Sequence, residues 1–246
     1  DAPVNDGTAF AKSGIVCIAI NYRMGIDGFL PVPGAPTNLG LRDMLFALEW
    51  VNENAAAFGG DPANITVFGE SAGGMAIANL VASPLAKGLF DRAIIQSGHG
   101  AMVREISVAQ KLVRKLARKL GVTPDAEGFR SVSFEDGWAA IEKLAKPWAI
   151  DLRDEDGHEP VFGISRFIPV WGDDVLPLKR TVPRFPYVPA DPARLERETA
   201  RVLRRGSPRR RKPPPLWDGK AGERIAAVTT KQAQTQCVAT VTALRI

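Results

Sequence analysis

Short, continuous apolar runs alternate with longer helical patterns along the first half of the chain. Apolar runs at 14–20 and 65–68 predict two strands, and residues 92–97, with Ala93, Ile94 and Ile95 at their centre, predict a third. The run at 14–20 is continuously apolar, which is typical of a strand that is buried on both faces of a parallel sheet. Between the first two runs, apolar residues recur at helical spacing over 41–51, and Gly and Pro residues at 58–62 end the predicted helix. This order predicts an α/β fold with a mostly parallel central sheet and flanking helices.

A second helical region follows the third apolar run. An apolar stripe from Val108 to Leu120 predicts a helix that Ser107 caps and Gly121 ends, and a further helix is expected over about 135–146. The opposite face of the first helix is basic. An anionic surface would bind such a face, but the ordinary solvated face of an amphipathic helix is the favoured interpretation. The basic residues are Lys111, Arg114, Lys115, Arg118 and Lys119.

The character of the chain changes after about residue 183. Prolines recur every three residues over Pro183–Pro192, and arginine clusters follow at 204–205 and 209–211. Prolines interrupt regular hydrogen bonding, and clustered like charges repel one another. The sequence therefore predicts two parts. Residues 1–182 form a partial α/β domain, and residues 183–246 form a basic, Pro- and Arg-rich tail that is poorly ordered or read out of frame.

Composition and charge bear on disulfides, on the distribution of charge and on membrane segments. The 246 residues are 45% hydrophobic and include two cysteines, Cys17 and Cys237, which do not make a disulfide framework. Residues 1–178 hold 16 Lys and Arg against 22 Asp and Glu, a net charge of −6, whereas residues 179–246 hold 16 against 5, a net charge of +11. No apolar run is long enough for a membrane span, and no secretory leader pattern is visible. A cytoplasmic location is favoured.

The strongest chemical motif is the Gly-Glu-Ser-Ala-Gly sequence at residues 69–73. It follows the apolar run at 65–68 and precedes a small-residue apolar segment at 75–82, so it lies between a predicted strand and a predicted helix. This context is typical of a nucleophile elbow, in which a sharp turn exposes the Ser71 hydroxyl. The Ala72 N–H would then face the oxygen of an attacked carbonyl. A glycine-rich turn with an incidental serine is the less favoured alternative.

Several motifs beyond the elbow resemble those of one family. They are Asn21–Gly25, Asn38–Asp43, Phe58–Gly74, Arg92–Gly98 and Pro169–Pro177. Together they resemble the type-B carboxylesterases, which include bacterial para-nitrobenzyl esterases and the cholinesterases, over about residues 1–178. Met44 is a small departure, because a glutamine is usual there. The resemblance implies an α/β-hydrolase fold that is incomplete in this chain, which is identified as a truncated member of the family.

The family implies a two-step hydrolysis of carboxylic esters. Ser71 would attack the ester carbonyl and form an acyl-enzyme, and Ala72 would provide one oxyanion N–H. Ser97 would belong to a buried polar network behind the acid of the triad, or would simply be a capping hydroxyl at a strand end. The implied partner is a small-molecule ester, with no cofactor, metal, specific nucleic acid or membrane, and the oligomeric state stays open. Substrate would also contact Glu70, Gly69 and Gly73.

The base and acid of a complete triad are not found in the sequence. The family order is serine, then acid, then histidine, and the acid would follow residue 177. Both histidines, His99 and His158, precede that position, so each is interpreted as an ordinary loop residue. The glycine pair that completes the family's oxyanion hole is expected upstream of residue 1, and Gly25 and Gly28 do not replace it. A truncated, frameshifted carboxylesterase gene would explain these features and the tail, which leaves the activity of this chain in question.

Other functional classes stay open at this level. A catalytically silent binding or adhesion protein would share the fold, although it has no chemical need for Ser71. A nucleic-acid or anionic-membrane binder could act through the basic tail, with an affinity that falls steeply with salt. An amidase or thioesterase could use the same sheet, since a fold does not determine the substrate.

Overall fold

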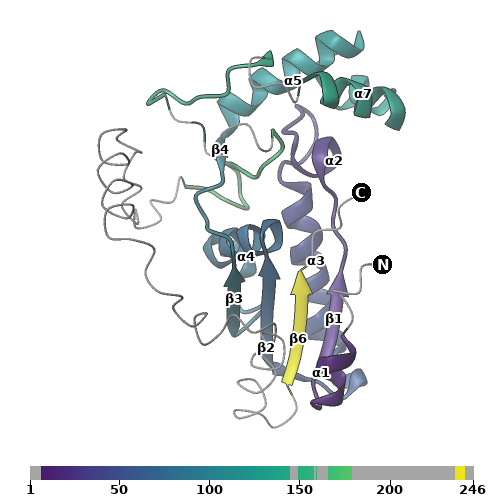
Figure 1. Cartoon of the computed structure of the whole chain (residues 1–246), viewed down its shortest axis with the longest axis vertical. Coiled ribbons are helices and arrows are strands. Elements are labelled where there is room, and N and C mark those ends of the chain that lie inside the picture. The colour runs from purple at the N-terminus through teal and green to yellow at the C-terminus, as the bar shows by residue number, and fades with distance from the viewer. Residues whose placement is uncertain (1–6, 145–148, 158, 160–165, 179–235, 242–246) are drawn as a thin grey trace, which may run out of the picture.

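The centre of the protein is a parallel sheet, shown in the computed structural model in Figure 1. Across the sheet the described strands are ordered β1 (Val16–Ile20), β6 (Gln236–Val241), β2 (Asp61–Glu70) and β3 (Arg92–Gln96), and all neighbours pair in parallel. The structure describes residues 7–144, 149–157, 159, 166–178 and 236–241. The three strands predicted from the apolar runs are confirmed as β1, β2 and β3.

Strand β6 was not expected from the sequence. It lies in the segment predicted as a poorly ordered tail, yet it pairs with β1 on one side and β2 on the other. In the register, Cys237 stands beside Val16 of β1 and Ile65 of β2. A parallel pair between segments so distant in sequence leaves no local signal, because each strand needs only a short apolar run. The rest of the predicted tail at 183–246 lies outside the described residues.

Helices flank the sheet and build a second layer at one end of the molecule (Figure 1). The predicted helices are confirmed as α3, α5 and α7. Ser107 is not the N-cap of α5, because the helix begins at Ile106 and the Ser107 hydroxyl donates to Glu105 Oε1 at 2.6 Å. No described helix is long and apolar enough to cross a bilayer. The α-helices are α1 (Thr8–Lys12), α2 (Gly25–Phe29), α3 (Leu39–Asn54), α4 (Ala72–Ala82), α5 (Ile106–Leu120), α6 (Ala126–Arg130) and α7 (Phe134–Leu144).

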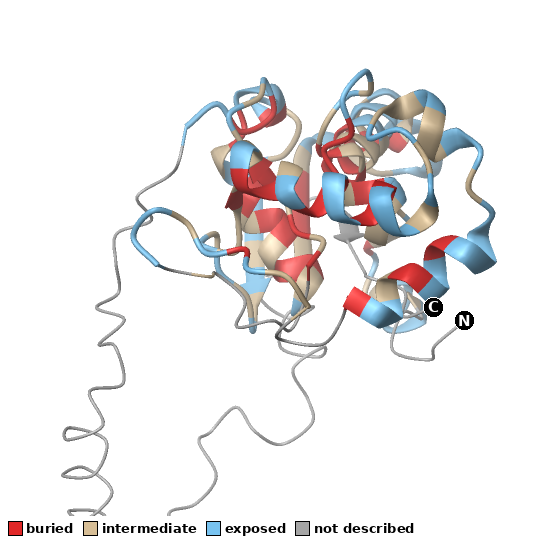
Figure 2. Ribbon diagram, turned by 90° about the horizontal axis from the view of Figure 1, so that it is seen from above, coloured by how far each residue is buried: buried red, intermediate tan, exposed pale blue. Residues whose placement is uncertain are grey.

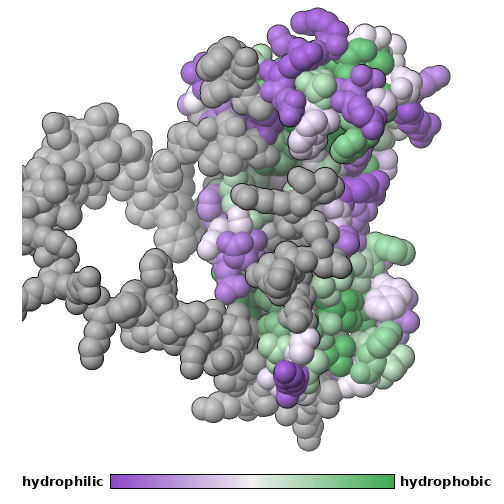
Figure 3. Space-filling model, turned by 45° about the vertical axis from the view of Figure 1, so that its right-hand side comes forward, coloured by the Kyte–Doolittle hydropathy of each residue, from purple (hydrophilic) through white to green (hydrophobic). Residues whose placement is uncertain are grey.

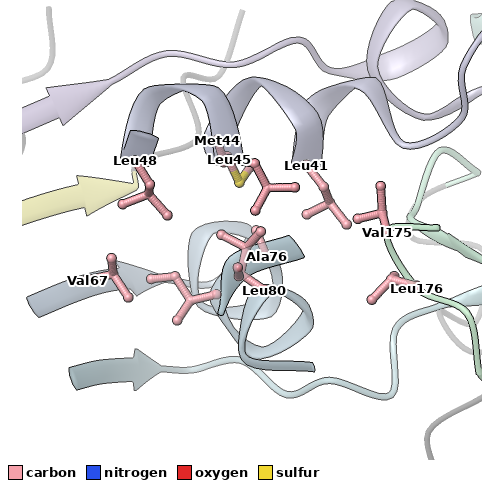
Figure 4. Close-up of a cluster of buried hydrophobic side chains, with 11 residues drawn as sticks. Leu41, Met44, Leu45, Leu48, Val67, Ala76, Leu80, Val175 and Leu176 are labelled. Atoms are coloured by element: carbon pink, nitrogen blue, oxygen red, sulfur yellow. The ribbon is translucent and has the colours of Figure 1, made fainter. Parts of the chain in front are cut away.

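The main hydrophobic core lies between the sheet and the pair of helices α3 and α4 (Figure 4). Alternation along β2 sends Val67 into this core, while Phe68 faces the other side, where its ring lies 5.3 Å from that of Phe10 in α1. Val175 and Leu176 close the core from a segment distant in sequence. The cluster contains Leu41, Met44, Leu45, Leu48, Val67, Ala76, Ile77, Leu80, Ala86, Val175 and Leu176.

Strand β1 departs from the expected burial. Val16, Cys17 and Ile18 are half-buried and Ala19 is exposed, whereas a strand buried on both faces was predicted. Among the described strands β1 is at one edge of the sheet, and fewer elements cover it than cover β2. The continuous apolar run therefore predicted a strand of a parallel sheet correctly. It did not predict that this strand lies at an edge of the described sheet.

A second hydrophobic cluster holds helices α5 and α7 together at the end of the molecule beyond the sheet. Figure 2 shows that the buried residues of the helices lie on their inward faces. Val108, Leu112 and Leu116 of α5 pack with Ala140 and Leu144 of α7. Below this layer, a short parallel pair joins β4 (Arg104–Glu105) to β5 (Val170–Trp171). The amphipathic pattern of α5 thus reflects packing on one face, and its basic face points away from the cluster.

Candidate active site

The predicted nucleophile elbow forms the junction between β2 and α4. Ser71 has φ 51° and ψ −116°, a positive-φ backbone conformation that residues with side chains rarely adopt. Two backbone hydrogen bonds hold it: Ser71 N donates to Gln96 O at 2.9 Å, and Met75 N donates to Ser71 O at 2.9 Å. Strained backbone of this kind persists only where its surroundings hold it. Here the surroundings are β3 on one side and the first turn of α4 on the other.

The elbow places the predicted reactive groups together. Ser71 is exposed, so its hydroxyl is accessible to a ligand, and Ala72 begins α4 directly after it. The first N–H groups of a helix have no partner within the helix and lie at its positive end. An oxygen that gains negative charge near Ser71 would therefore meet a donor in the Ala72 N–H. This geometry agrees with the predicted roles of Ser71 and Ala72, which stay predictions.

The turn after β3 packs directly against the elbow, and sequence reasoning missed its importance. A Cβ atom on Gly98 would lie 2.7 Å from Met75 N and 3.0 Å from Ser71 O. A Cβ atom on Gly74 would lie 2.7 Å from Gln96 O. Gly69 and Gly73, which were predicted to contact substrate, are both buried. Ser97 and Gly98, directly after β3, were the available signal in the sequence. Their contact with the elbow could not be predicted from it, because the contact depends on how β2 and β3 pair.

Two other predicted site residues flank the elbow. Glu70, the last residue of β2, is exposed next to Ser71. Ser97 is also exposed and has φ 52°, so two residues with positive φ lie at the same end of the sheet, after neighbouring strands. The Ser97 hydroxyl makes no hydrogen bond to a described residue. A pocket role for Glu70, and either predicted role for Ser97, therefore stay predictions.

The histidines agree with their interpretation as loop residues as far as they are described. His99 is exposed, and its Nδ1 accepts a hydrogen bond from Ala101 N at 3.3 Å. His158 lies outside the described residues. Across the described part of the chain, no cluster of three His, Cys, Asp or Glu side chains could hold a metal.

The core beneath the elbow is fixed by a buried amide. Asn38, at the start of α3, has φ 54° and only 2% exposure. Its side chain pairs with both backbone groups of Val170, since Nδ2 donates to Val170 O at 2.7 Å and Oδ1 accepts from Val170 N at 2.8 Å. Nδ2 also donates to Asp173 Oδ2 at 2.9 Å, and Leu176 N donates to Asp173 Oδ1 at 2.7 Å. These bonds hold the 170–176 segment, which supplies Val175 and Leu176 to the core that residues of α3 and α4 also form (Figure 4).

A second polar contact ties the loop after β1 to α3. Arg23 binds the Asp43 carboxylate with its guanidinium, with Nη2–Oδ1 at 2.6 Å and Nε–Oδ2 at 2.9 Å, and its backbone N donates to the same group at 2.9 Å. Partial burial raises the pKa of Asp43, but these hydrogen bonds outweigh it and hold the pKa below its ordinary value. Asn38 and Asp43 both belong to the motif that opens α3, so this motif anchors two distant segments.

The known proteins that are similar to this chain are esterases. The sequence model described as "Carboxylesterase family" matches residues 1–198. The chain is 43% identical over 148 residues to the para-nitrobenzyl esterase of Bacillus subtilis (strain 168), which covers 58% of the chain and 30% of that protein. It is 41% identical over 136 residues to the liver carboxylesterase of Sus scrofa, covering 54% of the chain and 24% of that protein. The solved structure of a thermophilic PNB esterase superposes with a TM-score of 0.54 and 37% identity, covering 64% of this chain and 32% of that one.

The matches cover only part of each relative, and the family match crosses the boundary that was predicted at residue 182. The chain spans about a third or less of the length of these relatives. The family match continues past the predicted boundary at residue 182, into residues 183–198, which lie outside the described part of the structure. The parallel sheet, the flanking helices and the structural neighbours confirm a partial α/β-hydrolase fold. The chain belongs to the carboxylesterase family.

Proposed function

We propose that this chain carries the nucleophile of a serine carboxylic ester hydrolase, with Ser71 as the reacting group. One observation carries the proposal. Ser71 is exposed in a positive-φ turn between a strand and a helix, and the first N–H of that helix, Ala72, follows it directly. The names of the relatives support esters as the substrate class, because both curated relatives are esterases.

The chemistry follows from the position of these groups. Ser71 Oγ adds to the carbonyl carbon of a small carboxylic ester while its proton passes to a general base, and the carbonyl oxygen becomes an oxyanion. The Ala72 N–H stabilises that charge, and one such donor typically lowers the barrier by about 2.7–4 kcal/mol. Collapse of the intermediate releases the alcohol and leaves an acyl group on Ser71, which water removes as the acid. The general base and its acid partner are not identified among the described residues.

Covalent labelling tests the nucleophile without requiring a complete catalytic cycle. A fluorophosphonate probe reacts with an activated serine by displacement of fluoride, and the adduct does not depend on the later hydrolysis step. We expect a covalent adduct at Ser71 in the folded chain, located by mass spectrometry of the digested protein and formed more slowly than on a serine that has a general base. Ser71→Ala removes the reacting oxygen and should abolish the adduct.

A matched control separates activation from exposure. Ser131, at the end of α6, is also exposed, and its hydroxyl donates to Gly128 O at 2.7 Å. Ser131→Ala should label like the unaltered chain, and heat-denatured protein should not label. Equal labelling of the Ser71→Ala variant, or the absence of an adduct on protein that unfolds cooperatively, would count against the proposed function.

A further inference from the structure

Two arginine side chains are buried between the sheet and the helix layer of α5 and α7. The charged side chains of these helices are all exposed, and Figure 3 shows many hydrophilic side chains at that end of the molecule. By contrast, Arg104 of β4 is 3% exposed and Arg166 is 5% exposed. Both guanidinium groups lie near one carboxylate oxygen, Glu159 Oε1, with Arg104 Nη2 at 3.5 Å and Arg166 Nη1 at 3.1 Å. This buried arginine cluster therefore holds two positive charges against one negative charge.

Stability alone does not account for the cluster. Taking two guanidinium groups out of water is unfavourable, and apolar side chains of similar volume are often at least as stable at such sites. Burial lowers the pKa of Arg104 to about 10, with Glu159 opposing the shift and Arg166 adding to it. Arg104 Nε is also buried, and it has no hydrogen-bond partner among the described residues. The presence of an arginine at position 104 therefore requires another explanation.

Arg104 joins the chain that follows β3 to a segment distant in sequence. Its Nη1 donates to Arg166 O at 2.8 Å, and its backbone N donates to Pro169 O at 2.9 Å. Its strand, β4, pairs with β5 at the start of the 170–176 segment, which Asn38 holds through Val170. Figure 1 shows β4 on the path from β3 to α5. Arg104 is thus a point at which the chain after β3 is fixed to the rest of the protein.

The other end of the same stretch of chain touches the proposed nucleophile. Residues 97–103 connect β3 to β4, and Gly98 near their start packs so closely that a Cβ there would lie 3.0 Å from Ser71 O. Within this connection, the hydrogen bond from Ala101 N to His99 Nδ1, at 3.3 Å, is local and ties it to no other segment. The position of the connection against the elbow therefore depends on how Arg104 holds its far end.

We propose that Arg104 is a positioning residue for Ser71. The proposal rests on the proposed function, because the position of Ser71 affects a rate only if Ser71 reacts. The guanidinium directs donors at Arg166 O and Glu159 from one rigid plane, which an apolar or single-donor side chain cannot do. Arg104 thereby fixes the 97–103 connection, and the connection holds the Ser71 backbone at its positive φ. Glu159 supplies the negative charge that both buried arginines share.

Arg104→Met separates positioning from stability in the full chain. Methionine fills a similar volume without charge, and it leaves Arg166 paired with Glu159 at balanced charge. The urea unfolding midpoint should therefore stay the same or rise. The maximal rate of fluorophosphonate labelling of Ser71 at saturating probe should fall at least about fivefold, because small displacements of a reacting group are costly. The probe concentration that gives half the maximal rate should not change. A merely structural residue would alter the unfolding midpoint and leave the maximal rate of the folded chain unaltered.

Two further variants complete the test. Arg130→Met removes an exposed arginine from α6 and should label like the unaltered chain. Arg104→Lys keeps the charge but not the planar group, so it should also lower the maximal rate, and it carries the test if Arg104→Met does not fold. Folded Arg104 variants that label as fast as Arg130→Met, or that change only the half-saturating probe concentration, would overturn this proposal and leave the proposed function standing. An unaltered chain that forms no adduct would instead count against the proposed function, and this proposal would fail with it.

Discussion

Replacing Gly98 with alanine should slow fluorophosphonate labelling of Ser71 by at least about tenfold, because a displacement near 1 Å at a reacting group can cost about a hundredfold. The added methyl group would lie 2.7 Å from Met75 N, 2.8 Å from Gly74 C and 3.0 Å from Ser71 O. All three are backbone atoms of the elbow, so they cannot turn aside as a flexible side chain does. The turn after β3 and the elbow must therefore separate, which also strains the hydrogen bond from Ser71 N to Gln96 O.

The same substitution should reduce stability only moderately. Overpacking at a tight contact typically costs about 1–3 kcal/mol, so the chain should still fold. Gly137→Ala is a suitable control, because a Cβ there would meet Val132 and Ile26 at 3.7 and 3.8 Å, which is ordinary contact. In the interior of α7 that change should be neutral or favourable. Urea unfolding and labelling rates measure both effects, and a Gly98→Ala protein that labels as fast as the Gly137→Ala control would contradict this account.

Replacing Asn38 with leucine should lower the free energy of unfolding by about 3–6 kcal/mol, since buried groups left unpaired cost about 1–3 kcal/mol each. The leucine removes the partner of both Val170 backbone groups and one donor to Asp173. It also places a bulky side chain at φ 54°, which adds strain. Because the 170–176 segment supplies Val175 and Leu176 to the core that residues of α4 also form, labelling of Ser71 should slow as well.

Two further variants separate the two causes of the expected loss of stability in Asn38→Leu, which are the lost hydrogen bonds and the backbone strain. Asn38→Gly keeps the left-handed backbone accessible and removes only the side-chain hydrogen bonds, so it isolates their contribution. Asn54→Leu is the control, because Asn54 makes one exposed hydrogen bond, from Nδ2 to Trp50 O at 2.8 Å, and has an ordinary φ of −113°. Urea unfolding measures all three. If Asn38→Leu were as stable as Asn54→Leu, the amide pairing would not hold the core as described.

Much of the fold near the elbow could be predicted from sequence, because the determining interactions are local. An apolar run at 65–68 followed by Gly-Glu-Ser-Ala-Gly indicated strand, turn and helix, and β2 and α4 have these positions. The apolar stripe of α5 indicated its buried face, since helical periodicity alone decides which residues share a side. The predicted Ser107 cap was wrong, because helix ends depend on backbone geometry within one or two residues.

By itself, the sequence determined the family, the parallel α/β class and the position of Ser71 in its turn, since each depends on short motifs and on periodicity. Only the tertiary structure decided which distant segments meet. It paired Asn38 with Val170, 132 residues apart, placed Gly98 against the backbone of Ser71, and inserted β6 between β1 and β2. Such contacts depend on complementary shape and hydrogen bonding between surfaces that form only when the chain has folded, so no local pattern encodes them.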